Sequence, residues 1–166
     1  MFIYFVSDAF INLHVALSLV GIASGLVAVF GLMAGKLLPG WTPLFLSSTL
    51  ATSVSGFGIP APHLLPSHYT GFISLAVLAI AFAALYWGRL AGAWRWIYAV
   101  TAVVALYLNV FVLVVQTFRK VPDLRALAPT ESEPPFLYAQ IATLALFAIF
   151  AIIAAIRLRA DPAPAS

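Results

Sequence analysis

Histidine is the residue type in this chain best suited to site chemistry, and the sequence holds His14, His63 and His68. An imidazole titrates near neutrality, and its neutral form is a common protein ligand of zinc, copper and haem iron. His14 and either of the other two could therefore hold a metal or clasp a b-type haem. The spacing is not diagnostic, because His63 and His68 lie five residues apart across Pro66.

Several other chemistries lack the residues that they need. Cysteine is absent, which excludes disulfides, thiolate metal sites and cysteine nucleophiles. No acidic residue falls within a long apolar stretch, although proton-coupled transporters usually carry one there. A serine-hydrolase nucleophile elbow is also missing. The sequence favours a binding site, and it decides neither for nor against an enzymatic activity.

Amide side chains accompany the histidines. Asn109 and Gln116 are seven residues apart, and Gln140 and Thr143 are three apart, so each pair shares a helix face. A polar side chain inside a membrane is costly unless it is paired or faces water. These amides are therefore either hydrogen bonds between helices or parts of a polar pocket shared with His14.

Long apolar stretches must position these residues. Hydrophobic residues make up 64% of the 166 positions and charged residues 8%, against about 25% charged in a soluble domain. Such a chain belongs in a lipid bilayer, where only helices or closed barrels satisfy their backbone groups. The stretches are too long for barrel strands and do not alternate in polarity. We predict an all-α integral membrane bundle, with residues 1–166 as a single transmembrane domain.

Five transmembrane helices are predicted, over residues 10–33, 42–57, 69–87, 96–118 and 136–158. Crossing the hydrocarbon takes about 20 helical residues, with a lower limit of about 17. The second stretch is shorter than this, so the alternative is four spans plus a short re-entrant segment. The tail over 159–166 is predicted to be flexible.

Five alternating spans place all three histidines at the same end of the bundle, which we call the histidine end. His14, Ser18, Gly21 and Gly25 follow steps of 4, 3 and 4 residues and share one helix face. Gly21 and Gly25 form a small-xxx-small pattern that lets a neighbouring helix approach closely. We therefore expect His14 to point into the bundle and not into lipid.

Basic residues predict the orientation. Five lie at the end opposite the histidines, the basic end: Lys36, Arg89, Arg95, Arg157 and Arg159. Three lie at the histidine end: Arg119, Lys120 and Arg125. Because the more basic side faces the cytoplasm, the N-terminus is predicted outside and the C-terminus inside. The net charge of +3 is spread over the loops, so no nucleic-acid partner is expected.

Four segments form a longer pattern. They read TSVSGFGIP at 52–60, PSHYTG at 66–71, ALYLNVFV at 105–112 and LAPTESEPPF at 127–136, with Gln116, Phe118 and Lys120 between the last two. Together they resemble a group of small bacterial multi-pass inner-membrane proteins. The resemblance covers most of the chain. It implies a bacterial inner-membrane location and brings no established activity, cofactor or ligand.

The leading functional hypothesis is a small membrane protein whose outer-face pocket binds a metal, a haem or another small ligand. The expected ligand-binding residues are His14, His68, Asn109, His63, Gln116 and Gln140. In the metal version His14 and His68 are the ligands, and Asn109 and Gln140 orient their rings. Haem b, copper and zinc are the candidate cofactors.

Two alternatives use the same residues differently. In an accessory or scaffold subunit of a membrane complex, the polar residues would only hold helices together. That role needs a membrane-protein partner or a second copy of the chain. A transporter or channel component would need an oligomer with a continuous polar path, because few polar residues lie in the spans. The partner that the composition itself predicts is the lipid bilayer.

Overall fold

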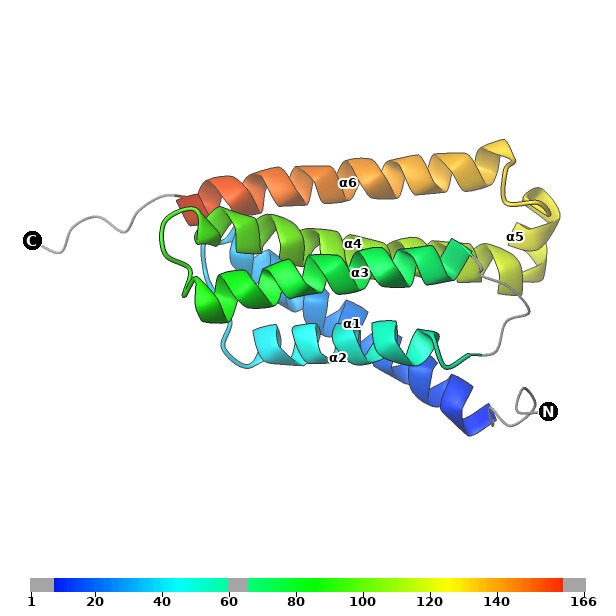
Figure 1. Cartoon of the computed structure of the whole chain (residues 1–166). Coiled ribbons are helices and arrows are strands. Elements are labelled where there is room, and N and C mark those ends of the chain that lie inside the picture. Colours follow the sequence, from blue (N-terminus) through cyan, green and yellow to red (C-terminus); the bar gives the residue numbers. More distant parts are fainter. Residues whose placement is uncertain (1–7, 60–65, 160–166) are drawn as a thin grey trace, which may run out of the picture.

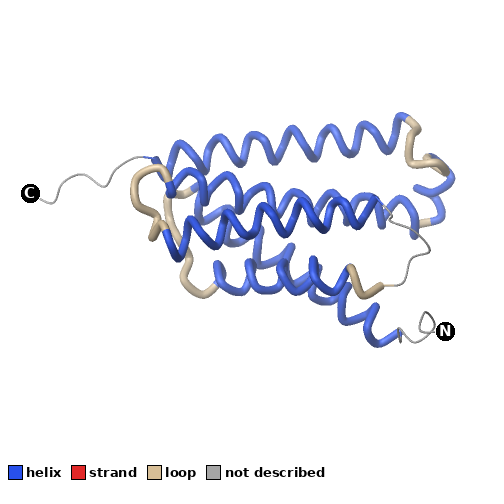
Figure 2. Tube along the Cα trace, viewed as in Figure 1, coloured by secondary structure: helices blue, strands red, loops and turns tan. Residues whose placement is uncertain are grey.

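Helices make up the fold. The structure, a computed structural model, describes residues 8–59 and 66–159, and no strand occurs among them (Figure 2). The elements are α1 (Asp8–Met33), α2 (Trp41–Gly56), α3 (Pro66–Phe82), the π-helical turn η1 (Ala83–Trp87), α4 (Trp94–Lys120), α5 (Pro122–Leu127) and α6 (Pro134–Arg159). The predicted all-α class is confirmed, and each long helix begins and ends within three residues of a predicted stretch. His63 and the tail beyond Arg159 lie outside the described residues.

Four helical stretches are long and apolar enough to cross a bilayer, so the chain is an integral membrane protein. They are α1, α3 continued by η1, α4 and α6, with 26, 20, 27 and 26 residues. The remaining helix, α2, has 16 residues, which is about 24 Å of helix and short for a span. The chain enters α2 at the basic end and leaves it toward the histidine end without doubling back (Figure 1).

The central helix of the bundle is α4, which contacts α1, α2, α3 and α6. Small residues line much of its buried face, with Ala99, Ala102 and Ala105 almost fully inaccessible. Such residues let neighbouring helices approach closely where no hydrophobic force drives helices together. By contrast α6 runs along α4 on the side away from α2 (Figure 1) and buries few residues. Most of α6 therefore faces lipid.

At the two predicted glycines, side chains of neighbouring helices pack directly against the backbone of α1. A Cβ atom at Gly25 would lie 2.7 Å from Leu106 Cδ1 and equally close to the ring of Phe45. At Gly21 it would lie 3.1 Å from Thr49 Oγ1. The close helix approach predicted from these glycines is confirmed, and it brings α1 against both α2 and α4.

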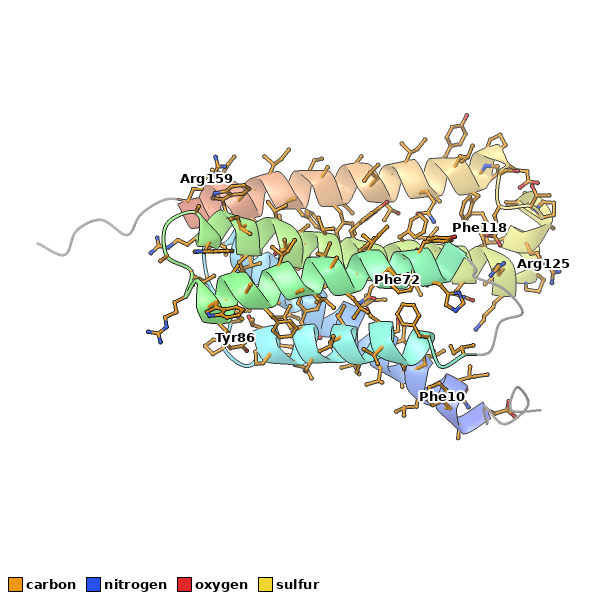
Figure 3. All side chains as sticks on the ribbon, viewed as in Figure 1. Phe10, Phe72, Tyr86, Phe118, Arg125 and Arg159 are labelled. Atoms are coloured by element: carbon orange, nitrogen blue, oxygen red, sulfur yellow. The ribbon has the colours of Figure 1, made fainter. Side chains whose placement is uncertain are left out.

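Aromatic and basic residues gather at the basic end. The guanidinium of Arg159, labelled in Figure 3, lies 4.9 Å from the ring centroid of Trp96. Trp41 and Trp87 are exposed at the same end. Tryptophan favours the headgroup level of a bilayer, and arginine binds the face of an aromatic ring. This end therefore has the composition of a membrane–water boundary.

We expect Gly25→Ala to lower the free energy of unfolding by roughly 1–3 kcal/mol, the usual cost of overpacking. The added methyl group would force Phe45 and Leu106 to move, and neither has free space in the core. Gly40→Ala is the control, since no atom lies within 4 Å of a Cβ there. Unfolding in mixed detergent micelles measures both variants, and equal stability would contradict this view of the packing.

Candidate functional site

A cavity of about 220 Å³ lies within the bundle at the histidine end. Its walls come from α1, α2, α3 and α4, and Figure 3 shows the side chains of this end, marked by Phe10, Phe118 and Arg125. The polar lining includes His14, Ser18, His68, Asn109 and Gln116. Apolar side chains, among them Phe57, Leu108 and Val112, complete the walls.

Asn109 closes the floor of this cavity. It is buried on α4, and its Nδ2 donates a hydrogen bond to Thr49 Oγ1 on α2 over 3.1 Å. On the far side of this layer, Phe45 and Leu106 are fully buried and pack against Gly25. The cavity is therefore a pocket with one closed end, and within the described residues no polar path continues from it to the basic end.

The imidazole of His14 is held by a short hydrogen-bonded chain. Its Nδ1 lies 2.8 Å from Ser55 Oγ, and the same hydroxyl donates to the Thr52 carbonyl over 3.1 Å. A hydroxyl has one proton, and we assign it to the bond with Thr52; Ser55 then accepts from His14, and the proton of the neutral ring lies on Nδ1. The Nε2 atom then carries a lone pair and has no hydrogen-bond partner among the described residues. His14 thus offers the cavity an acceptor that can also bind a metal.

His68 enters the same cavity from the first turn of α3. Its ring centroid lies 5.9 Å from that of Phe57, and the Phe57 ring in turn packs on Phe72 at 4.7 Å. The structure therefore brings together two of the three histidines, His14 and His68, as predicted from the alternation of the spans. The third, His63, lies outside the described residues.

At the mouth of the cavity, the positive charge of Arg119 is neutralised by an ion pair with Glu131. Gln116 and Arg119 lie three residues apart on the cavity side of α4. Arg119 Nε donates to Glu131 Oε1 over 2.5 Å, and the two side chains are 56% and 30% exposed. Glu133 is held within its own loop, where hydrogen bonds from Thr130 lower the pKa of the Glu133 carboxyl. Its carboxylate thus stays ionised and engaged away from the cavity.

One predicted site residue does not take part. Gln140 is not among the residues that line the cavity, because it faces the other side of α4. Its Nε2 donates to the Phe111 carbonyl over 3.3 Å, and its Oε1 is buried with no hydrogen-bond partner in the described part of the chain. The prediction that Gln140 contributes to the pocket, or orients a histidine, is therefore corrected. No residue of α6 lines the cavity; helices α2 and α3 complete its walls together with α1 and α4.

Four of the six predicted site residues surround one cavity: His14, His68, Asn109 and Gln116. In comparisons with protein-family models, with curated proteins and with solved structures, the chain has no match. The residues of the cavity therefore carry the functional proposal.

The geometry of the cavity gives little support to a bound metal ion or haem. No three His, Asp or Glu side chains of residues 8–59 and 66–159 come together as a group that could hold a metal ion. The cavity is also smaller than the roughly 300–1,000 Å³ of pockets that hold drug-sized ligands. A haem is larger than such a ligand, so the cavity suits a smaller molecule.

Ser55 and Arg119 are two of the residues at this site that are not among the six predicted ones. Both extend a face that the sequence already shows, since Ser55 follows Thr52 by three residues and Arg119 follows Gln116 by three. The helical spacing could therefore have found them. No spacing rule, however, pairs Ser55 with His14, because that contact joins different helices.

We expect nitrogen NMR of histidine-labelled protein to find neutral His14 with its proton on Nδ1 and a bare Nε2. The Ser55→Ala variant should admit the Nε2–H form, because the acceptor that fixes the proton on Nδ1 is gone. Ser47→Ala is the matched control, since Ser47 is exposed and its hydroxyl bonds the Leu44 carbonyl of its own helix. A protonated Nε2 in the unaltered protein would contradict the hydrogen-bonded chain.

Proposed function

We propose that this chain is a small bacterial inner-membrane protein that binds a small ligand in the pocket at its histidine end. The observation behind the proposal is the set of polar atoms without partners around one cavity. His14 Nε2 and the Gln116 amide have no hydrogen-bond partner among the described residues, and both residues line the 220 Å³ space. Polar atoms in a membrane interior are costly unless water or a ligand satisfies them.

The proposed orientation puts the pocket on the outer side of the membrane. Five basic residues at the basic end, against three at the histidine end, support a cytoplasmic basic end. This orientation requires α2 to cross the bilayer with its 16 residues. Its one-way course between α1 and α3 supports that crossing (Figure 1). Ligand would then enter from the outside, past Gln116 and Arg119.

The competing functions have weaker support. In an accessory subunit the polar residues would serve as contacts between helices, and Gln140 and the Nδ2 group of Asn109 do serve in that way. Contacts between helices do not explain a cavity with unpaired polar atoms. A channel or transporter needs a continuous polar path, and Phe45 and Leu106 block that path inside one chain.

Native mass spectrometry of gently purified protein, together with its metal content, tests the binding function. We expect a bound small molecule in the unaltered protein and its loss in Gln116→Leu, which removes a polar group from the wall. Gln140→Leu makes the same chemical change on the other side of α4 and should keep the ligand. Equal occupancy in both variants, or none in the unaltered protein, would contradict the proposed pocket.

Single cysteines test access and orientation, because the chain contains none of its own. We expect Ser18→Cys to react with a charged methanethiosulfonate reagent added outside intact cells, since Ser18 lines the cavity. Ser24→Cys is the control on the same helix, because Ser24 is buried beyond the cavity floor and should stay unlabelled. Labelling of Ser18→Cys from the cytoplasmic side alone would reverse the orientation.

A further inference from the structure

Two hydrogen-bond acceptors at the inner end of the pocket determine which ligand groups can bind there. With the Ser55 proton assigned to its bond with Thr52, the ring proton of neutral His14 lies on Nδ1, and Nε2 is an acceptor. Asn109 Nδ2 gives one of its two N–H groups to Thr49, and its Oδ1 is an acceptor with no hydrogen bond from the described residues. A ligand that pairs with His14 Nε2 and Asn109 Oδ1 must therefore donate a hydrogen bond.

The charges around the pocket favour an uncharged molecule. None of the described residues that line it is acidic, so a cation would find no counter-charge there. The one permanent positive charge in the lining belongs to Arg119, whose guanidinium is bound to Glu131. An anion would have to compete with that carboxylate at an exposed position, where an ion pair gains little.

Size and shape restrict the ligand further. The cavity holds about seven water volumes, which is room for a single substituted ring. Asn109 and Arg119 are ten residues apart on α4, so floor and mouth are separated by about 15 Å. Between them the walls include Phe57, Leu108 and Val112. The space suits an apolar body that carries a polar group at its inner end.

We infer that the pocket binds an uncharged alcohol or phenol of one ring, with its hydroxyl donating to His14 Nε2. This inference rests on the proposed ligand-binding function and names the class of ligand. A free phenol and the hydroxylated head group of a membrane lipid share this chemistry.

Two isomers provide the main test: 4-methylphenol has a hydroxyl donor, and methoxybenzene has the same atoms without one. We expect 4-methylphenol to bind protein in lipid nanodiscs at least tenfold more tightly than methoxybenzene in ligand-observed NMR titrations. A site built around a donor rejects an analogue that lacks it, because the acceptor stays unpaired. The His14→Phe variant should abolish the preference, and Gln140→Leu should retain it. Benzoate and benzylammonium should bind more weakly than 4-methylphenol.

A second variant keeps the test interpretable if His14→Phe fails to fold. Ser55→Ala keeps the imidazole but releases Nδ1, so that part of the neutral His14 population presents an N–H to the cavity. We expect the preference for 4-methylphenol over methoxybenzene to fall severalfold in this variant. An unchanged preference in both Ser55→Ala and His14→Phe would overturn the role of Nε2.

Other outcomes separate failure of this inference from failure of the proposed function. Equal affinity for the two isomers, or tighter binding of benzoate or of Zn²⁺, would overturn the ligand class and leave a binding pocket in place. No saturable binding of any of these probes would overturn both. Displacement of 4-methylphenol by 4-dodecylphenol carried in the nanodisc lipid would identify a membrane-borne ligand, and its failure to displace would identify a water-borne one.

Discussion

The hydrogen bond from Asn109 to Thr49, beside Gly21, divides the bundle into two parts with different packing. Toward the basic end, Gly25 allows α1 to meet Phe45 and Leu106 with no space left over. Toward the histidine end the same three helices leave room for the cavity. One hydrogen bond between membrane helices contributes only about 0.6 kcal/mol. The bond matters here because of where it lies. It marks the depth in the bundle at which tight helix packing ends and the cavity begins.

Most polar side chains in the spans are satisfied within their own helix, which makes the exceptions informative. On α2, Thr52 donates to the Ser48 carbonyl and Ser53 donates to the Thr49 carbonyl. Such bonds let hydroxyl-rich helices lie in a membrane without an external partner. Against this background, the free Nε2 of His14 stands out, since its ring is fixed from behind by Ser55. His14 thus presents an unpaired ring nitrogen at the cavity, while the buried Tyr98 hydroxyl and Gln140 Oε1 are unpaired elsewhere in the described bundle.

The sequence predicted the helices and much of the pocket because both follow from periodicity. Apolar length located the spans, and alternation of the spans put His14 and His68 at one end. Seven-residue spacing put Asn109 and Gln116 on one face of α4. Gln140 was misassigned because the rotation of α6 about its axis depends on packing against α4, which spacing within α6 does not reveal.

The position of α6 has a consequence for how the protein is made. The cavity walls belong to α1, α2, α3 and α4, and the last of these ends at Lys120. Chains emerge from the ribosome N-terminus first, and their parts begin to assemble in that order. All the walls of the pocket are thus synthesised before Pro134, the first residue of α6. Because α6 supplies no lining residue, the four helices that form the pocket can assemble before α6 docks on α4.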